Sequence, residues 1–269
     1  MLNLGDGGPA VTELQRELLA LGYGLPRFGA DGSLGNETLD AMTHFLADHE
    51  QGYHDDDINA VSDQELAFVA RVTEAMVPLP PQFFDQRFAA AQAGIGGRRT
   101  WNSITGICLH QTDCDFGHEG PTRWDTLHAH VGISREDFAV WVHDFQWVVW
   151  HANELNPTDV GVECEGVYPG VMGDPKAMVV TPELVDKAQV AIRWICAVVA
   201  AHGGKIVNLH AHRQTAASRR ADPGAEIWQR VAIPMLAELG LSDGGPAFKI
   251  DNGRVIPEVW NPAYVGNAY

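Results

Sequence analysis

Apolar residues recur at helical spacing twice within the first 50 residues, which predicts two short helices. The first helix begins at Pro9, a residue suited to the first helical position, and Gly22 ends it. Its apolar face consists of Val11, Leu14, Leu18 and Leu21. After a glycine-rich turn, the second helix carries an apolar face of Leu39, Met42, Phe45 and Leu46. A unit of this size buries only a modest core, which favours a binding module at residues 1–50 over a catalytic domain.

Residues 51–97 are predicted to form a helical connector. Ser62 and Glu65 have the spacing of a capping box, and apolar residues follow them at helical intervals. This helix is either the third helix of the first module or a helix that packs between domains. The acidic stretch Asp55-Asp56-Asp57 is expected in a solvated loop, and the prolines between residues 78 and 81 end the helix.

The pattern changes near residue 98, where short apolar runs alternate with longer helical patterns. Runs typical of strands occupy residues 104–109, 140–142, 146–150, 160–164 and 206–209. A long helix is predicted after Thr181 and Pro182, and a last helix covers about residues 224–239, with a kink or break at Pro234. This mixture predicts an α/β domain at residues 98–240, in which helices cover a central sheet. Aromatic residues in the tail, 241–269, favour its packing on that domain.

Composition and charge narrow the classes of function. The chain has 45% hydrophobic and 20% charged residues, as ordinary soluble globular proteins do. It has no apolar run near the roughly 20 residues that span a bilayer, and its N-terminus lacks the features of a signal peptide, so we expect synthesis in the cytoplasm. The net charge of −17 argues against nucleic acid and anionic membranes as partners, because both need clustered lysine and arginine. The cysteines form no CxxC pair and are expected to be buried free thiols: Cys108, Cys114, Cys164 and Cys196.

Three residues at the ends of predicted elements are candidate metal ligands. His110 follows the first strand, His212 follows the last strand, and Asp222 comes just before the final helix. Side chains at strand ends meet at one edge of an α/β sheet, where sites form. Two imidazoles and a carboxylate leave one position of a zinc tetrahedron open, which is typical of catalytic zinc. His210 competes with His212, because residues two apart on a strand face the same side.

Five motifs in this part of the chain resemble one family. They are Ile107-Cys108-Leu109-His110-Gln111-Thr112, Trp150-His151-Ala152, Val160-Gly161-Val162-Glu163-Cys164-Glu165-Gly166, Ala211-His212-Arg213 and Arg220-Ala221-Asp222-Pro223-Gly224. In this order they resemble the type 2 N-acetylmuramoyl-L-alanine amidases, which are relatives of phage lysozyme-amidases and peptidoglycan recognition proteins. The resemblance implies a central mixed β-sheet flanked by helices, and Zn²⁺ held by His110, His212 and Asp222. It favours His212 over His210, because the family's His-Arg pair falls there.

Glu163 is the candidate general base. It lies on an otherwise apolar strand, where an unpaired carboxylate is expensive to bury, and it matches the catalytic glutamate of the resembled family. Glu165 faces the same side and is the alternative. Arg220 stands where the family usually has lysine; it is suited to stabilising an oxyanion, although arginine cannot deliver a proton. Some relatives use a tyrosine where this chain has Ala129, and that difference puts more weight on Glu163.

Other histidines and one cysteine have weaker assignments. His151 is a candidate for binding substrate or for bracing the site, with an ordinary packed histidine as the other interpretation. Cys108 shares a strand face with His110, which permits thiolate ligation, although a packed thiol is the simpler interpretation. The remaining histidines of the domain's first half are expected at the surface or in loops: His118, His128, His130 and His143.

The first module resembles the peptidoglycan-binding domain type 1, a three-helix module often attached to wall hydrolases. The matching residues are Leu4-Gly5-Asp6-Gly7-Gly8, Val11, Leu14-Gln15, Leu18, Leu21-Gly22-Tyr23, Asp31-Gly32, Gly35, Thr38 and Phe45, while Leu46 departs from the usual Phe-Gln ending. The combination of this module with an amidase domain resembles a phage endolysin.

The expected function is zinc-dependent hydrolysis of the amide between N-acetylmuramic acid and L-alanine in bacterial peptidoglycan. The expected partner is peptidoglycan, and the expected state is a monomer that acts on the cell wall, with release through a phage holin as one route. Two alternatives remain: a recognition protein that binds the wall without cutting it, and a zinc peptidase that cuts a stem-peptide bond.

Overall fold

The computed structural model describes residues 1–49, 59–74, 77–87, 94–117 and 119–264. The chain divides into two compact units, Met1–Val77 and Pro78–Tyr269. The acidic stretch Asp55-Asp56-Asp57 and His118, both assigned from the sequence, lie outside the described residues. None of the described helices is long and apolar enough to cross a membrane.

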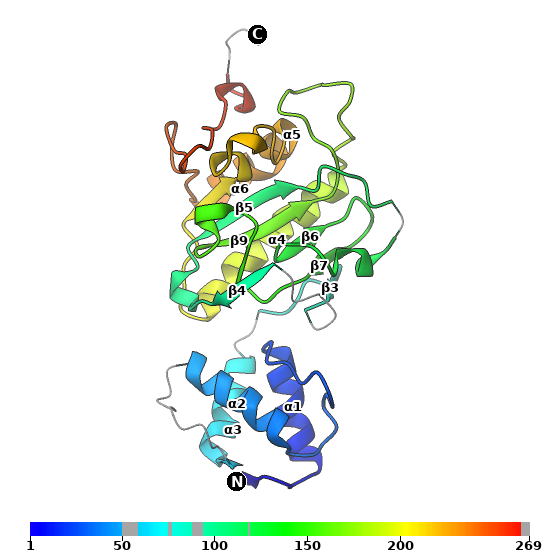
Figure 1. Cartoon of the computed structure of the whole chain (residues 1–269), viewed down its shortest axis with the longest axis vertical. Helices are drawn as coiled ribbons and strands as arrows, with labels where there is room; N and C mark the ends of the chain where they lie inside the picture. Colours follow the sequence, from blue (N-terminus) through cyan, green and yellow to red (C-terminus); the bar gives the residue numbers. More distant parts are fainter. Residues whose placement is uncertain (50–58, 75–76, 88–93, 118, 265–269) are drawn as a thin grey trace. The chain divides into compact units, whose positions relative to one another are not determined.

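The first unit contains three helices, α1 (Pro9–Ala20), α2 (Asn36–Asp48) and α3 (Asp63–Glu74), as Figure 1 shows. A short antiparallel pair, β1 (Leu2–Asn3) and β2 (Ala60–Val61), joins the start of the unit to the segment before α3. The predicted capping box is confirmed: the Ser62 amide donates to Glu65, and the Glu65 amide donates to the Ser62 hydroxyl. The helix that the sequence placed in the connector therefore lies in the first unit.

The apolar faces predicted for the first two helices form the core of this unit. Its fully buried members include Val11, Leu18, Met42 and Phe45. Gln15 is buried among them, and its amide donates to Asp31 and the Ser33 carbonyl in the turn before α2 and to Thr38 in the first turn of α2. A buried amide is tolerated because every bond it needs is made inside the unit.

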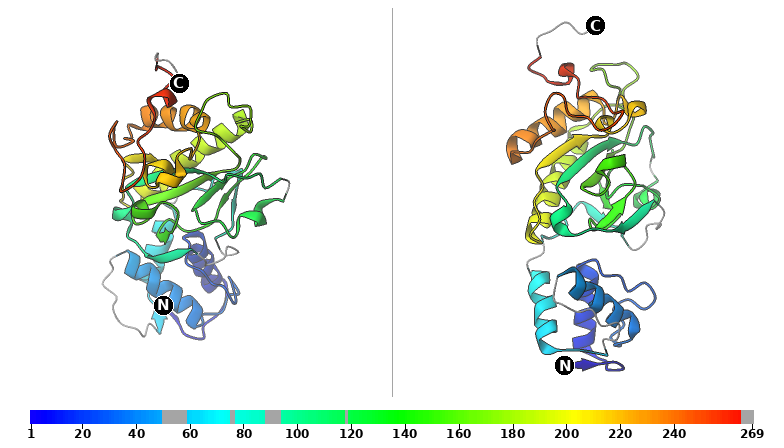
Figure 2. Two further views of the ribbon diagram at one scale, coloured as in Figure 1. Left: turned by 45° about the horizontal axis from the view of Figure 1, so that its top comes forward. Right: turned by 60° about the vertical axis from the view of Figure 1, so that its left-hand side comes forward.

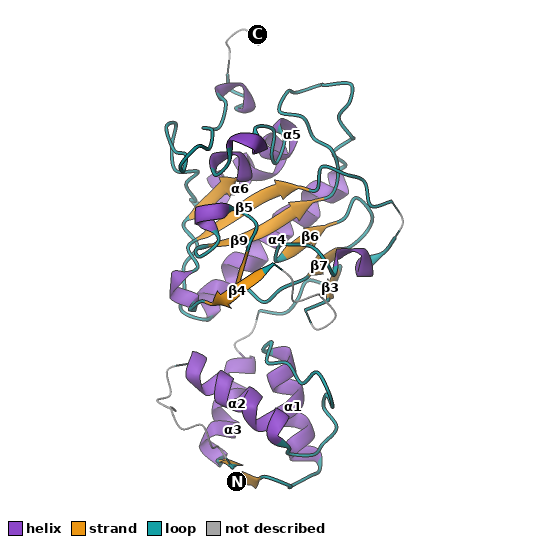
Figure 3. Cartoon of the chain, in the orientation of Figure 1, coloured by secondary structure: helices purple, strands orange, loops and turns teal. Residues whose placement is uncertain are grey.

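The second unit is built on a six-stranded sheet in the order β10-β5-β9-β6-β7-β3 (Figure 3). The strands are β3 (Phe83–Asp85), β5 (Gly106–Gln111), β6 (Val131–Ile133), β7 (Ala139–Trp141), β9 (Asp159–Cys164) and β10 (Asn208–Ala211). The pair β6–β7 is antiparallel and the other neighbours run parallel, so the sheet is mixed. A separate antiparallel pair joins β4 (Ile95–Arg98) to β8 (Trp147–Val149). The predicted central mixed sheet flanked by helices is confirmed.

The long helix α4 (Pro182–Ala201) lies across the sheet against β9 and β6 (Figure 1). Thr181 caps it, since its hydroxyl accepts from the Leu184 amide at 3.2 Å. The helix after α4 and β10 is interrupted as predicted: α5 (Ala225–Ile227) and α6 (Ile233–Leu239) flank a π-helical turn at Trp228–Ala232. Pro234 cannot donate to the Arg230 carbonyl four residues back, and that carbonyl accepts from the Gln189 amide at 2.9 Å instead.

The tail after α6 continues along the edge of the sheet. Ser242 forms a bridge with Asn208 beside β10, and Trp260 is fully buried. Both views in Figure 2 show this segment beside the α5–α6 region. The described tail, residues 241–264, thus forms part of the second unit rather than a free extension.

Three strands of the second unit were not predicted, and one of them is β6 (Val131–Ile133). Phe83–Asp85 and Ile95–Arg98 were assigned to the connector, because runs of three and four residues carry too little pattern to indicate strands. They form only by pairing with β7 and β8, which are distant in sequence.

Candidate metal centre

The strand register brings the candidate residues of three elements side by side. In the parallel pair β5–β9, His110 stands opposite Glu163. In the pair β10–β5, Ala211 stands opposite Leu109, so His212 follows directly beside His110. Asp222 reaches the same place from the turn before α5. Residues at the same level of neighbouring parallel strands point to the same face, which places these side chains together.

Three ligand atoms converge at this point. His110 Nδ1 lies 2.8 Å from His212 Nδ1, and His212 Nδ1 lies 2.9 Å from Asp222 Oδ2. All three donor atoms lie within 4.8 Å of one another, and all three residues are buried. Donor atoms around a tetrahedral zinc ion, with bonds of about 2.0–2.1 Å, stand about 3.3 Å apart. The donor set therefore fits zinc in type and number, and its atoms are close enough together to share one ion.

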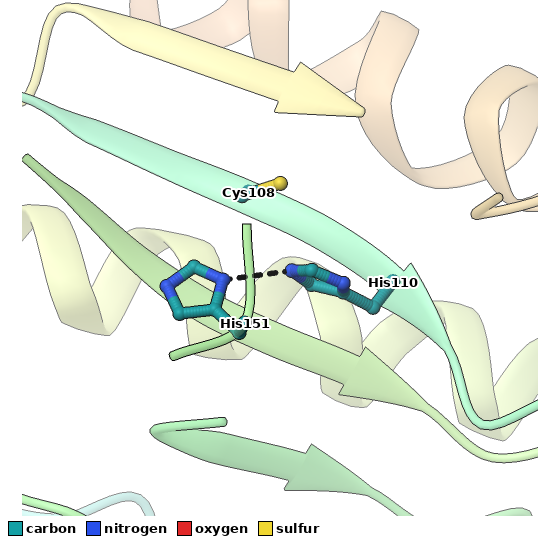
Figure 4. A group of neighbouring side chains, drawn as sticks. All are labelled: Cys108, His110 and His151. Atoms are coloured by element: carbon teal, nitrogen blue, oxygen red, sulfur yellow. Dashed lines mark hydrogen bonds between the residues drawn. The ribbon is translucent and has the colours of Figure 1, made fainter. Parts of the chain in front are cut away.

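A chain of hydrogen bonds sets the tautomer of His110. His151 Nε2 lies 3.2 Å from the Asp159 carbonyl, which can only accept, so this nitrogen carries the proton. Burial lowers the pKa of His151 to about 3, so its Nδ1 is an unprotonated acceptor. His110 Nε2 lies 2.9 Å from that atom and donates to it, as Figure 4 illustrates. The Nδ1 atom of His110 therefore carries a lone pair and no proton, and it lies on the side of His212 and Asp222.

Gly161 makes room for this arrangement. A Cβ atom at position 161 would lie 2.9 Å from the His151 ring. The sequence assigned His151 to substrate binding or to bracing. Its two ring nitrogens are both engaged inside the protein, which favours the bracing interpretation.

The Asp222 carboxylate is also oriented. Its Oδ1 accepts from the Gln111 amide at 3.0 Å, which leaves Oδ2 to face His212. The Gln111 side chain in turn donates to the carbonyls of Tyr168 and Ala221. Burial raises the pKa of Asp222, and the contacts with His212 oppose that rise. One carboxylate oxygen thus faces His212 while the other is already satisfied by a main-chain donor.

A second group of possible ligands overlaps the first. Cys108 and His151 lie close enough to His110 to hold a metal ion with it, and all three are buried (Figure 4). Burial raises the pKa of the Cys108 thiol, and the negative charges of Asp159 and Asp222 raise it further. A thiolate is therefore disfavoured there, and the nearby His110 Nε2 already donates to His151. The set with Asp222 is the better metal site.

Glu163 lies beside the ligands and has a strongly shifted pKa. Burial raises this pKa to about 8, the negative charge of Asp222 adds to the rise, and the positive charge of Arg219 opposes it. The residue as a whole is partly exposed, and it stands opposite His110 in the register of the two strands. A carboxyl group that titrates near neutral pH can both accept and donate a proton.

Glu165, the alternative base, has all its bonds inside the protein. Its carboxylate accepts from the Phe116 and Arg135 amides at 2.8 Å and from the Ser134 hydroxyl at 2.9 Å. It is fully buried and joins two loops. This arrangement suits a structural carboxylate and leaves Glu163 as the better candidate base.

Two neighbouring arginines lie in the segment before Asp222. Both Arg219 and Arg220 are exposed. The charge of Arg219 lowers the pKa values of His110, Glu163 and Asp222, so this guanidinium acts on the site. The sequence singled out only Arg220, whose main-chain carbonyl accepts from Arg213. Arg219 carries no motif that would have identified it from sequence.

His210, the competitor of His212, has a different partner. Its Nδ1 lies 2.7 Å from Asp159 Oδ2, and its ring stacks on Phe248 with the ring centroids 4.9 Å apart. It thus belongs to a buried His–Asp pair, while His212 faces His110 and Asp222.

The positions predicted for two further histidines were wrong. His130 and His143 were expected at the surface, but both are buried. His130 Nδ1 accepts from the Gly161 amide, its Nε2 lies 2.9 Å from the Trp147 carbonyl, and His143 Nε2 lies 3.1 Å from the Leu127 carbonyl. Backbone groups on neighbouring segments satisfy these rings, and the local sequence contains no sign of such partners.

Several depressed histidine pKa values give the metal-free protein a defined acid sensitivity. Burial holds the pKa values of His110, His130 and His151 well below the usual 6.5. The folded state therefore binds fewer protons than the unfolded state below about pH 6.5, and stability is lost as the pH falls. Glu163 acts in the opposite sense, because its raised pKa makes the folded state bind one more proton between its ordinary pKa and about 8.

We therefore expect the free energy of unfolding of the metal-free protein to be greatest near neutral pH. More histidines with lowered pKa values than carboxyl groups with raised pKa values contribute, so the free energy of unfolding should fall as the pH drops below about 6. Urea denaturation of chelated protein at a series of pH values measures it. His128→Gln, at an exposed histidine, is the control that leaves the profile unchanged. A flat profile between about pH 5 and 7 would contradict the burial of neutral imidazoles.

No protein-family model matches the chain. One stretch of 42 residues is 48% identical to the N-acetylmuramoyl-L-alanine amidase CwlL of Bacillus licheniformis, and it spans 16% of this chain and 12% of that protein. Among solved structures, the endolysin N-acetylmuramoyl-L-alanine amidase LysCS of Clostridium intestinale is similar at 15% identity, with a TM-score of 0.43 over 61% of this chain and 98% of that chain. Drosophila PGRP-LB is similar at 17% identity, with a TM-score of 0.40 over 54% and 92% of the two chains. By sequence, the chain is thus similar to an amidase over one short stretch.

Proposed function

We propose that this protein is a zinc-dependent peptidoglycan amidase that hydrolyses the amide between N-acetylmuramic acid and L-alanine. The observation that carries the proposal is the meeting of His110, His212 and Asp222 with Glu163 on the neighbouring strand. Three neutral or anionic ligands beside a carboxyl group of raised pKa are the combination that metal-assisted hydrolysis requires. The short match to an amidase supports the choice of bond.

His110, His212 and Asp222 would hold the zinc ion. When bound, zinc supplies Lewis acidity, which polarises a scissile carbonyl group and acidifies water. His151 keeps the Nδ1 atom of His110 unprotonated, and the Gln111 amide holds the Asp222 carboxylate in place. These neighbours keep the ligands in one protonation state and one orientation.

Glu163 would move the proton during hydrolysis. Its carboxylate takes a proton from the attacking water and passes it to the nitrogen of the leaving L-alanine. A pKa near the working pH suits a group that must first accept and then release a proton. A cation bound nearby would favour the ionised carboxylate before the proton is taken up. The register of β5 and β9, in which Glu163 stands opposite His110, supports this role.

Arg220 would stabilise the oxyanion that develops on the scissile carbonyl. It is exposed and stands two residues before Asp222, so its guanidinium is free to reach a substrate. Arginine does not release its proton, so proton delivery to the leaving group remains with Glu163. Arg219 would favour the ionised forms of Glu163 and Asp222, whose pKa values it lowers.

The first unit would hold the enzyme on its polymeric substrate. It is a compact three-helix unit with its own buried core and a sequence that resembles a wall-binding module. Linking a binding module to a catalytic domain raises the effective concentration of substrate without a new contact in the active site. The proposed partner is accordingly bacterial peptidoglycan.

The test is digestion of purified peptidoglycan, followed by mass spectrometry of the soluble products. Stem peptides with a free N-terminal L-alanine are expected, and treatment with a chelator should remove the activity until zinc is restored. Tight binding to intact peptidoglycan without products would instead indicate a recognition protein. Products with other new ends would indicate a peptidase and overturn the assignment of the bond.

A further inference from the structure

One loop begins at His212 and ends at Asp222, the two proposed metal ligands. The C-terminal tail lies along that loop. We define the ligand loop as residues 212–222 and the tail as residues 241–264. Apart from short 3-10 turns, the ligand loop has no regular structure of its own. His110, in contrast, lies on a strand with a partner on each side. Within the loop, the Arg213 amide donates to the Asp222 carbonyl at 3.0 Å and joins the two ends. Contacts from outside the loop add to this single bond in keeping the ends at the spacing that a metal ion requires.

Main-chain hydrogen bonds connect the tail to the start of the ligand loop. The Ile250 amide donates to the Gln214 carbonyl at 2.8 Å, and the Arg254 amide donates to the Arg213 carbonyl at 2.8 Å. The Arg213 guanidinium returns a bond to the Val255 carbonyl at 3.0 Å. These bonds hold the backbone of the two residues that follow His212.

The two backbones approach closely at Gly253. A Cβ atom at this position would lie 2.0 Å from the Gln214 carbonyl oxygen, a distance at which the backbone must move. The contact therefore requires glycine, and the tail at this point rests directly on the ligand loop.

Trp260 joins both ends of the ligand loop. Its ring lies 4.7 Å from the guanidinium of Arg213, which follows His212. Its indole N–H donates to the Gly170 carbonyl at 2.7 Å, and Gly170 lies against Ala221, which precedes Asp222. Arg213 also donates to the Arg220 carbonyl, across the loop. The indole is fully buried, so these contacts are shielded from water.

We infer that Trp260 is a positioning residue for the metal centre, and that the tail holds His212 and Asp222 in the geometry that binds the ion. This inference rests on the proposed zinc site, but not on the identity of the bond that is cut. A loop ordered before the ion arrives loses little conformational entropy on binding it, so affinity depends on the tail. Residues that orient metal ligands from outside the ligand set typically change affinity by about 10–100-fold.

The experiment measures zinc affinity of the full chain by competition with a chromophoric chelator. Trp260→Leu removes the ring and the N–H, and a loss of affinity of about 10–100-fold is expected. Trp260→Phe keeps a ring for Arg213 but removes the N–H donor to Gly170, and a loss of about fivefold is expected. Val255→Ala is the matched control in the tail, because its side chain is exposed and its carbonyl is retained. Val199→Ala, in the core of α4, controls for a general loss of stability.

Weaker zinc binding in the Trp260 variants, with native affinity in Val255→Ala and Val199→Ala, supports the inference. Native zinc affinity in a folded Trp260→Leu protein overturns it. If Trp260→Leu does not fold, Trp260→Phe decides, since native affinity in that variant also overturns the inference. The outcome is separate from that of the proposed function: a wild-type protein that binds zinc but releases no stem peptides would refute the amidase and leave this inference standing.

Discussion

Replacement of Glu163 by glutamine is expected to lower kcat for peptidoglycan hydrolysis by about 10²–10⁴-fold while zinc affinity stays close to that of the wild type. Glutamine keeps the size and the hydrogen-bonding capacity of the side chain but cannot accept and release a proton. Glu163 is not among the three converging ligands, so its replacement leaves the donor set complete. The measurement combines the rate of release of stem peptides with a chelator competition for zinc.

The control for this variant is Glu165→Gln. Glu165 stands on the same face but bonds to loop amides and a serine hydroxyl. Its replacement weakens those bonds, so we expect a lower melting temperature and a kcat within a few-fold of wild type. A Glu163→Gln protein with near-native kcat, or a Glu165→Gln protein that is folded but inactive, would show that the base has been assigned to the wrong carboxylate.

Replacement of His212 by alanine is expected to weaken zinc binding by more than about 100-fold, because even residues outside the ligand set change affinity by about 10–100-fold. Two donors, His110 and Asp222, would remain, and they are fewer than the three protein ligands of catalytic zinc sites. Hydrolysis should be lost in parallel at limiting zinc. Chelator competition measures affinity, and titration with zinc shows whether activity returns at high metal concentration.

His210→Ala is the matched control, two residues away on the same stretch. It leaves the buried carboxylate of Asp159 without its imidazole partner, so a loss of stability of about 1–3 kcal/mol is expected. The zinc ligands are untouched, and affinity for zinc in the folded protein should stay near that of the wild type. Loss of zinc binding in His210→Ala, together with its retention in His212→Ala, would reverse the assignment of the ligand.

Much of the secondary structure could be predicted because its signals are local. Pro9 and Thr181-Pro182 mark helix starts, and Ser62 with Glu65 forms the capping box that the spacing indicated. The break near Pro234 follows from the missing amide of proline alone. Such effects act within a few residues of the chain, so the sequence contains the whole cause.

The strand pairing and the histidine environments could not be predicted in the same way. The edge strand Phe83–Asp85 exists only beside Ala139–Trp141. His130 is buried because the Gly161 amide and the Trp147 carbonyl come from distant segments to meet it. Neither segment carries a local pattern that would indicate these contacts, because their energy comes from partners far away in sequence.

The sequence by itself indicated several helix starts, the α/β class of the larger unit and the three candidate ligands His110, His212 and Asp222. Tertiary structure decided which of these residues meet. In the folded chain, His210 pairs with Asp159, whereas His212 lies beside His110 and Asp222. Glu165 accepts hydrogen bonds from loop residues, and the tail lies against the ligand loop. The physical reason is that helix propensity and capping are local, whereas ligand convergence, pKa shifts and burial depend on distances between residues that only the folded chain brings together.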